Sequence, residues 1–515
     1  MQWLNQVVNE AIDRQPTGEI LVSSGASPSG IYHFGHLREV ITCDAIVLAL
    51  RKLGREARHI HVVDNLDGFR KVPVNLPENY SQYLGMPLCD VPVPDGSARS
   101  YADYCLDPFV ESMHKLGIEF DLVYQNEKYR VGFYVPAIER SLQRVDAAKT
   151  ALETVSGRQL DDNWTPIQIM ENGRLKNRKY LGLDTDAKTV SYEDSDGNQQ
   201  TAKYDKGEVK LDWRLDWPGR WWLMNIAVEP FGRDHATKGG SFDTGCEIAK
   251  NVYDTKAPIP VPYDFVNRTG DTKKMSASKG TGVNARDITD VLPSEVIRYF
   301  MLRYSPSKRL FFDETETLIK LVDDYSELLS KQGQDDRDEE LLYLCNRGVN
   351  ERTISSVPFS HLVATYQASL GNVDETLKAI GRTEYVESTK NEADIIRREI
   401  EFVSRWLKTW APEDVKFSLL DKVNPADFSD IELSYLRALG DEIKSAPLDA
   451  DGQWFHSHIY AYKDTTGLSP KELFSTIYKA LIGKTSGPRV GWFLSILPRD
   501  WLVERLAMQD SSLNA

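Results

Sequence analysis

The spacing of apolar residues in the first seventy positions predicts a β-α-β unit. Residues 19–24 (EILVSS) form a short apolar run between two glycines, which indicates a buried strand. Residues 37–53 repeat apolar positions at helical spacing and stop at Gly54, the residue type expected just past a helix end. Residues 57–63 (ARHIHVV) predict a second strand. This order of elements favours a parallel sheet with a ligand site at its carboxyl edge.

The same pattern divides the whole chain into four regions. Residues 1–70 and 216–310 show α/β patterning, and we interpret them as the two halves of a Rossmann-type nucleotide-binding domain. Residues 71–215 interrupt this rhythm with a Pro-rich loop and short strands, which is typical of an inserted α/β subdomain. Residues 311–515 predict an all-α region, with helices expected over 315–330, 337–352, 358–371, 389–410, 430–445, 469–483 and 499–508.

Composition narrows the class of protein. The 515 residues correspond to about three domains at roughly 150 residues each. Apolar residues make up 41% and charged residues 27%, which is ordinary for a soluble globular protein. The chain has no apolar run long enough for a membrane span and no secretion signal at its start. Its five cysteines are odd in number and never spaced CxxC, so we expect a reducing, cytoplasmic location.

The negative charge is concentrated in the second part of the chain. The formal net charge is −15, of which residues 1–310 contribute −3 and residues 311–515 contribute −12. Such an acidic balance ordinarily disfavours a nucleic-acid partner. A nucleic acid meets a local surface, however, so an acidic chain that binds RNA must keep a basic track on one face.

The first segment with recognisable chemistry lies between the first strand and its helix. It reads GASPSGIYHFGH and runs from Gly25 to His36. Small residues let the backbone approach a nucleotide, Gly35 permits close stacking, and the following helix N-terminus favours phosphate. His33 and His36 are three residues apart, so both imidazoles can face a phosphate chain. By itself the segment could also be a Gly/Pro loop with incidental histidines.

The second segment is TKKMSASKG, residues 272–280, which follows the strand that ends near Asn267. Its lysines Lys273, Lys274 and Lys279, together with two serine hydroxyls, suit a triphosphate. Alone it could be a solvated basic loop. Its occurrence with the histidine-containing turn, in the same predicted sheet, points to one nucleotide site.

The two segments resemble the signature motifs of class I aminoacyl-tRNA synthetases, here HFGH and KMSAS. The fuller sequence resembles the class I lysyl-tRNA synthetases over about residues 20–310, and again in GLSPKELFSTIYKALIGKTSGPR near the C-terminus. The segments that carry the resemblance are SGASPSGIYHFGHLREV, DNLDGFRKVP, LDWRLDWPGRWW, EPFGRDHATKGGSFDTG, KKMSASKG and LPSEVIRYFMLRYSP. Other class I subfamilies share the two short motifs but not EPFGRDHATKGGS or the paired tryptophans.

The resemblance implies activation of L-lysine by ATP, with Mg²⁺ supplied alongside the ATP, and transfer of the lysyl group to tRNA(Lys). No enzyme nucleophile is then required, and catalysis rests on positioning and charge stabilisation. The implied catalytic residues are His33, His36, Lys274 and Lys279. The implied ATP-binding residues are Pro28, Gly35, His36, Lys274, Met275, Ser276 and Ser278.

Lysine as a substrate needs a carboxylate for its ammonium group and an aromatic wall for its stem. Matching the family's amino-acid site by position implies Gly25, Ser27, Trp213 and His235. Asp64 and Asp67, which follow the second strand, are added on chemical grounds as partners for the ammonium or the α-amino group. Trp213 could instead be a core residue, and Asp64 a turn cap.

The chain departs from the family in the inserted subdomain, where many members carry zinc-binding cysteine pairs. Here Met170 and Gly173 stand at such a position, so we predict no structural zinc and a subdomain held by apolar packing. The resemblance implies that residues 311–515 bind the anticodon. We expect the protein to be a monomer. Residues 402, 406 and 410 are aromatic and fall at helical spacing, which favours a core stripe over base stacking.

Three other functions are compatible with parts of the pattern. A glutamyl- or arginyl-type synthetase would share the scaffold, but a glutamate site needs a basic side chain aimed at the substrate carboxylate. A small-molecule nucleotidyltransferase would share the HxGH chemistry but would not need roughly 200 helical residues. A tRNA-binding regulator that has lost catalysis is disfavoured by intact His33, His36, Lys274 and Lys279.

Overall fold

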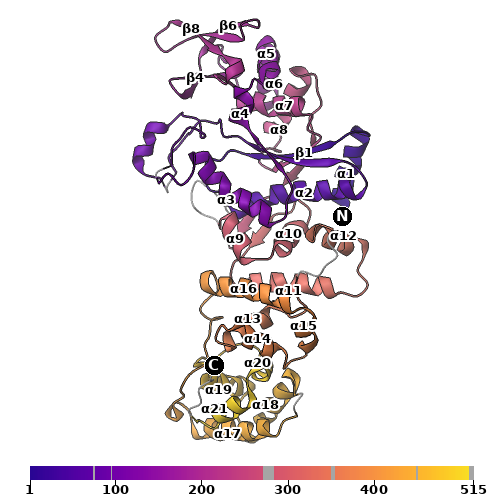
Figure 1. Ribbon diagram of the computed structural model, residues 1–515, viewed down its shortest axis with the longest axis vertical. Helices are drawn as coiled ribbons and strands as arrows, with labels where there is room; N and C mark the ends of the chain where they lie inside the picture. Colours follow the sequence, from indigo (N-terminus) through magenta and orange to yellow (C-terminus); the bar gives the residue numbers. More distant parts are fainter. Residues whose placement is uncertain (74–75, 94, 271–282, 349–353, 448–449, 510–515) are drawn as a thin grey trace. The chain divides into compact units, whose positions relative to one another are not determined.

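The computed structural model describes residues 1–515 except 74–75, 94, 271–282, 349–353, 448–449 and 510–515 (Figure 1). The described residues form two compact units. The first, here called the α/β unit, comprises Met1–Thr289, Ile297–Phe312 and Asp335–Val349. The second, called the helical unit, comprises Asp290–Val296, Asp313–Gln334 and Asn350–Ala515. In the described part of the chain, every helix is too short or too polar to cross a membrane.

A five-stranded, fully parallel sheet organises the α/β unit and confirms the predicted Rossmann-type architecture. The order of strands reverses at β1, because the chain moves outward to β2 and β3 on one side and later fills the other side with β10 and β11. The carboxyl ends of β1 and β10 therefore flank a switch point, the usual ligand position in such sheets. The strands in spatial order are β11 (Ile259–Tyr263), β10 (Val228–Gly232), β1 (Ile20–Ala26), β2 (Ala57–Val63) and β3 (Asp121–Tyr124).

Helices cover both faces of this sheet. On one face, Leu21 and Ile60 pack with Trp217 and Trp221 in a single apolar cluster. On the opposite face, the side chains of Ser24 in β1 and His59 in β2 are in contact, with Ser24 Oγ 2.7 Å from His59 Nε2. Burial on two faces explains why the strands are almost continuously apolar. The helices of this layer are α1 (Gln2–Arg14), α2 (Leu37–Lys52), α3 (Tyr101–Lys115), α7 (Trp213–Met224) and α8 (Ser241–Asn251).

The region between β3 and α7 folds as helices and two small antiparallel sheets around one apolar cluster. The stacked rings of Tyr129 and Tyr134 lie in this cluster, and Met170 packs against it. Gly173, with φ of +72°, makes the tight turn after β4. The elements are α4 (Gln125–Arg130), α5 (Val135–Gln143), α6 (Val145–Ser156), β4 (Ile167–Glu171), β5 (Arg174–Lys176), β6 (Lys179–Asp184), β7 (Thr189–Glu193), β8 (Gln199–Lys203) and β9 (Val209–Leu211).

One strand of the main sheet lies within the segment that the sequence suggested was an insertion. β3 (Asp121–Tyr124) pairs in parallel with β2, from Ile60↔Asp121 to Val63↔Tyr124. It has only four residues, none of them fully buried, so its apolar signal is weak.

The other elements of the α/β unit are β12 (Val266–Arg268), β13 (Leu310–Phe312), α12 (Asp336–Cys345) and the 3₁₀ helices η2 (Glu78–Tyr83) and η3 (Tyr204–Lys206). Two further helices, α9 (Ala285–Val291) and α10 (Ser294–Leu302), are divided between the two units.

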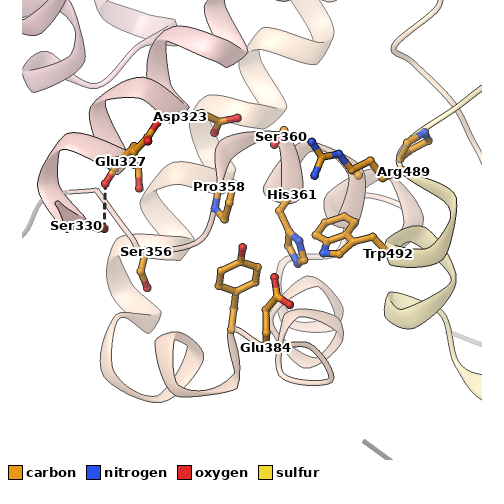
Figure 2. Close-up of a pocket in the computed structure, with 14 residues that line it drawn as sticks. Asp323, Glu327, Ser330, Ser356, Pro358, Ser360, His361, Glu384, Arg489 and Trp492 are labelled. Carbon is orange, nitrogen blue, oxygen red and sulfur yellow. Dashed lines mark hydrogen bonds between the residues drawn. The ribbon is translucent and has the colours of Figure 1, made fainter. Parts of the chain in front are cut away.

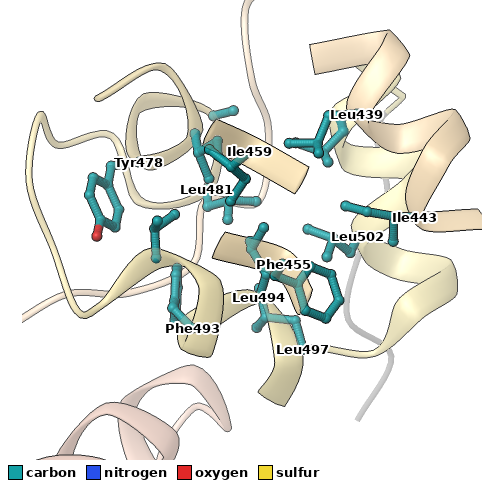
Figure 3. Close-up of a cluster of buried hydrophobic side chains, with 14 of the residues drawn as sticks. Leu439, Ile443, Phe455, Ile459, Tyr478, Leu481, Phe493, Leu494, Leu497 and Leu502 are labelled. Atoms are coloured by element: carbon teal, nitrogen blue, oxygen red, sulfur yellow. The ribbon is translucent and has the colours of Figure 1, made fainter. Parts of the chain in front are cut away.

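The helical unit has its own apolar core, formed mainly by its C-terminal helices (Figure 3). Figure 3 shows Leu439 and Ile443 of α17 facing Phe455 and Ile459 of α18 and Leu502 of α21. The helices of this unit are α11 (Glu316–Ser330), α13 (Phe359–Ala368), α14 (Val373–Ile380), α15 (Val386–Asn391), α16 (Ala393–Thr409), α17 (Asp430–Lys444), α18 (Gly452–Thr466), α19 (Pro470–Ile482), α20 (Val490–Ile496) and α21 (Arg499–Leu506), with the 3₁₀ turn η5 (Pro425–Asp427).

The aromatic stripe of residues 402, 406 and 410 lies on α16, and only its central residue is part of the buried core. Trp406 is fully buried and its indole Nε1 donates to the carbonyl of Glu314 over 2.9 Å. Phe402 and Trp410 are half-buried. The indole therefore supports the fold, and we do not consider it a candidate for base stacking.

Candidate active site

A cavity of about 400 Å³ lies at the carboxyl edge of the sheet, at the switch point between β1 and β10. Segments from the ends of β1, β2, β10 and β11 supply its walls, as parallel topology requires. Its lining residues are Gly25, Ala26, Ser27, Ser29, His33, Gly35, His36, Glu39, Asp64, Trp213, Trp217, Arg220, Glu229, Pro230, Phe231, Gly232, Asp234, His235, Tyr263, Phe265 and Val266.

The histidine motif forms the 3₁₀ turn η1 (Phe34–His36) directly before α2. His33 Nδ1 accepts from the Gly35 backbone N–H over 3.1 Å, and the His33 N–H donates to His36 Nδ1 over 3.1 Å. With Nδ1 accepting, a neutral His33 ring carries its proton on Nε2, which can then donate to a phosphate oxygen. His36 Nδ1 also lies 3.2 Å from the His33 carbonyl oxygen, so the backbone of His33 orients the His36 ring in either tautomer. A Cβ at Gly35 would lie 2.9 Å from His33 Cε1, so glycine is required there for the His33 ring to take this position.

Glu39, on the first turn of α2, is a site residue that the sequence reasoning missed. Its Oε1 accepts from the Gly25 N–H over 2.9 Å and its Oε2 from the Tyr263 hydroxyl over 2.6 Å. Burial raises the pKa of Glu39 to about 7; these two bonds oppose the shift, and the nearby Glu229 and Asp234 add to it. The sequence carried one signal for Glu39, its spacing: it follows His36 by three positions, and residues three apart share a helix face.

A second carboxylate, that of the buried Glu229 of β10, faces the same cavity. The indole N–H groups of Trp217 and Trp221 both donate to it, the first over 3.0 Å. Burial raises the pKa of Glu229 to about 7. Trp217 also stacks on Trp213, whose ring centroid lies 5.5 Å from that of His235. Carboxylates and aromatic rings thus occupy one wall, which suits a cationic ligand with an apolar stem.

Asp64 reaches the cavity but already has a cationic partner. Arg220 Nη2 lies 2.7 Å from Asp64 Oδ1 and 3.0 Å from Asp216 Oδ1, and all three side chains are buried. Burial would raise the pKa of Asp216, but Lys210 and Arg220 lower it below its usual range. Gln125 and Tyr129 also donate to Asp216, so this network is a fixed support beneath the cavity.

The remaining predicted site residues lie elsewhere. Asp67 pairs with buried Lys210 over 3.1 Å and does not line the cavity. Pro28 is buried in the first loop and is not part of the lining either. The predicted site residues of the second motif lie outside the described residues, namely Lys273, Lys274, Met275, Ser276, Ser278 and Lys279. The described residues contain no group of three or more His, Cys, Asp or Glu arranged for a metal ion.

Comparison with known proteins places the chain in a family. A family model described as tRNA synthetases class I (K) matches residues 1–345. Lysine–tRNA ligase 1 of Methanosarcina acetivorans is 36% identical over 98% of each chain, and lysine–tRNA ligase of Archaeoglobus fulgidus is 35% identical over 98% of this chain and 99% of its own. A glutamate tRNA ligase structure from Elizabethkingia meningosepticum aligns over 95% of this chain and 98% of its own at 12% identity, with a TM-score of 0.46, too distant for any inference. The chain belongs to the class I (K) family of tRNA synthetases.

Proposed function

We propose that this protein is a lysine–tRNA ligase, which activates L-lysine with ATP and transfers it to tRNA(Lys). The observation that carries the proposal is the excess of carboxylates in the cavity. Glu39, Asp64, Glu229 and Asp234 line it, against the single guanidinium of Arg220. When Glu39 and Glu229, whose pKa values are about 7, are ionised, this lining repels the side chain of a glutamate substrate and attracts a lysine ammonium. The names of the relatives that match nearly the whole chain support the same substrate.

Glu39 is the proposed partner of the substrate ammonium. Each of its oxygens already accepts one hydrogen bond from the protein, so the carboxylate is held in place with further lone pairs available to the ligand. The stacked rings of Trp213 and Trp217 provide a wall for the methylene stem. Asp64 shares its charge with Arg220, so we propose that it accepts a hydrogen bond from the α-amino group without supplying a full countercharge. Asp67 acts only through Lys210, in the network beneath the cavity.

ATP is proposed to bind beside lysine, with Mg²⁺ carried on its phosphates. His33 and His36 would donate to phosphate oxygens, Gly35 would lie against the nucleoside, and Lys274 and Lys279 would neutralise the leaving pyrophosphate. The lysine carboxylate attacks the α-phosphorus and the bond to the pyrophosphate oxygen breaks. The terminal ribose hydroxyl of tRNA(Lys) then displaces AMP from the adenylate. These residues position reactants and stabilise charge, and none becomes covalently modified.

The helical unit is proposed to bind the anticodon arm of the tRNA. Lys484, a residue in the C-terminal segment that resembles the family, donates its Nζ to the carbonyls of Glu413 and Lys416, and so holds the fold together. Arg489 in the same segment is exposed. The net charge of −12 after residue 310 requires the acidic side chains to face away from the RNA, and this stays a prediction.

Amino-acid-dependent exchange of pyrophosphate into ATP tests the proposal directly. Each of the twenty amino acids is assayed with and without tRNA. We expect exchange with lysine alone and no requirement for tRNA, because the cavity is built from protein groups only. Exchange that occurs with glutamate or arginine and depends on tRNA would overturn the assignment.

The affinity for lysine is expected to increase with pH between 6 and 8. The pKa of Glu39 is about 7, so its carboxyl group is mostly neutral at pH 6 and mostly charged at pH 8. Only the charged form pairs with the ammonium, and the ionised fraction rises about tenfold over this range. kcat/KM for lysine, measured by pyrophosphate exchange, should therefore rise by up to about tenfold. Glu39→Gln should lose most of this rise, and a flat profile in the unaltered protein would contradict the role of Glu39.

A further inference from the structure

Each unit of the protein has an arginine in the lining of a cavity, and the two arginines differ in burial. In the helical unit, Arg489 is exposed at a cavity of about 620 Å³ and lies near Trp492 (Figure 2). This cavity belongs to the unit already proposed to bind the anticodon arm. In the α/β unit, Arg220 lines the proposed lysine site and is only 2% exposed. Burying a charged guanidinium beside a substrate cavity is costly, so its position there calls for a functional reason.

The guanidinium of Arg220 uses one nitrogen for both of its ion pairs. Nη2 donates to Asp64 Oδ1 over 2.7 Å and to Asp216 Oδ1 over 3.0 Å. Nε is enclosed by the protein, whereas Nη1 is not enclosed and has no hydrogen-bond partner among the described residues. A Cβ at Gly25 would lie 3.6 Å from Nη1, so the glycine leaves the approach to this nitrogen open. Nη1 is therefore the part of the buried cation that a ligand in the cavity can reach.

Asp64, which lines the same cavity, also keeps one of its two oxygens available. Its Oδ1 accepts from Arg220, and its Oδ2 has no hydrogen-bond partner in the part of the chain that the structure describes. The pair thus satisfies itself through one atom of each side chain. The other atom of each, a carboxylate oxygen and a guanidinium nitrogen, can bind a ligand.

A ligand with an ammonium and a carboxylate on one carbon matches these two atoms. A simple anion would be repelled by Asp64, and an amine without a carboxylate would leave Nη1 unpaired. The α-amino and α-carboxylate groups of an amino acid satisfy both. We propose that Arg220 Nη1 binds the α-carboxylate of lysine while Asp64 Oδ2 accepts from its α-amino group, an inference that rests on the function proposed above. One carboxylate oxygen held by Arg220 leaves the other oriented to attack the α-phosphorus of ATP.

Asp216 holds the guanidinium in this position from the side away from the ligand. Its Oδ1 also accepts from Gln125 Nε2 over 2.6 Å, and its Oδ2 accepts from the Tyr129 hydroxyl over 2.6 Å. Burial lowers the pKa of Arg220, but Asp64 and Asp216 raise it well above its usual range, so the group stays charged. A donor that is fixed and charged in advance needs little reorganisation when the substrate carboxylate arrives.

Binding of lysine and of lysinol, in which a hydroxymethyl group replaces the carboxylate, tests the inference. Both dissociation constants are measured by isothermal titration calorimetry on the full-length protein without ATP or tRNA. Loss of a hydrogen bond between two charged groups is expected to make lysinol bind about 10- to 100-fold more weakly than lysine. Equal affinities, within about twofold, would overturn the inference.

Arg220→Lys tests whether this arginine is the source of the preference. The variant keeps the charge that Asp64 and Asp216 require, but its ammonium offers no second nitrogen in a planar fork. Lysine should bind more weakly, lysinol should bind nearly as before, and the ratio of their dissociation constants should fall to about threefold or less. A purely structural role for Arg220 predicts equal losses for both ligands, and that result would overturn the inference.

Asp216→Asn provides a second variant that should change the ratio in the opposite direction. It keeps an oxygen for Gln125 and Tyr129, and it leaves Asp64 and Asp67 to balance Arg220 and Lys210. With one countercharge removed, Arg220 should attract the substrate carboxylate more strongly and raise the ratio by roughly threefold. If Arg220→Lys does not fold, an unchanged ratio in Asp216→Asn overturns the inference.

Arg214→Lys is the matched control. Arg214 lies on the same helix, is half-buried, donates to Thr244 Oγ1 over 3.1 Å and does not line the cavity. The ratio should stay within about twofold of that in the unaltered protein, and a fall as large as in Arg220→Lys would contradict a specific role for Arg220. Lysine-dependent pyrophosphate exchange without a preference over lysinol overturns this inference alone. Absence of both lysine binding and lysine-dependent exchange in the unaltered protein overturns the proposed function as well.

Discussion

Replacing His36 by alanine should slow lysine-dependent pyrophosphate exchange by about 10²- to 10³-fold. His36 lines the cavity, and the contacts of its Nδ1 with the backbone of His33 fix the orientation of the ring. Negative charge grows on the phosphate oxygens as the lysine carboxylate attacks. A donor fixed in advance stabilises that charge more than it stabilises bound ATP, so kcat should fall while KM for ATP changes little.

His114→Ala is the matched control for this measurement. His114 is an exposed histidine on α3 of the same unit and does not line the cavity. Its replacement should leave the exchange rate within about twofold. His36→Asn, which keeps an N–H donor, should retain more activity than His36→Ala. An exchange rate in His36→Ala equal to that of the unaltered protein would remove this residue from the reaction.

Glu39→Gln should lower kcat/KM for lysine by about 10²-fold. The substitution keeps the size of the side chain and an oxygen that can accept from the Gly25 N–H, so the site should keep its shape. It removes the charge that pairs with the substrate ammonium, and loss of one partner of a buried charge pair costs about 3 kcal/mol or more. KM for ATP should remain unchanged, because the phosphates contact other residues of the site.

Glu56→Gln, at an exposed position just before β2, is the control for Glu39→Gln and should leave all kinetic constants unchanged. To test recognition of the ammonium, kcat/KM for lysine is compared with that for a neutral analogue in which a hydroxyl replaces the ε-amino group. The unaltered protein should strongly prefer lysine, and Glu39→Gln should reduce that preference. A preference that survives the substitution would place the ammonium at another carboxylate, with Glu229 the next candidate.

Much of the fold could be predicted from local pattern. The β1–α2–β2 unit and the long C-terminal helices agree with the sequence periods to within a few residues at most ends, because each buries one apolar face. α18 (Gly452–Thr466) was not predicted, because its sequence GQWFHSHIYAYKDTT mixes aromatic, histidine and polar residues and only Phe455 and Ile459 are buried. Its helical state depends on packing against neighbouring helices, which a single-sequence pattern does not contain.

The sequence by itself determined the parallel sheet, the histidine turn before α2 and the placement of Gly25, Ser27 and Asp64 at the carboxyl edge, since strand ends in a parallel sheet share one edge. The tertiary structure alone decided which charges remain available to a ligand. Arg220 comes 156 positions after Asp64 yet neutralises it, and Tyr263 comes 224 positions after Glu39 yet fixes its carboxylate. Residue type reveals the charge a side chain can carry, whereas burial and long-range partners determine whether that charge is used by the fold or presented to a substrate.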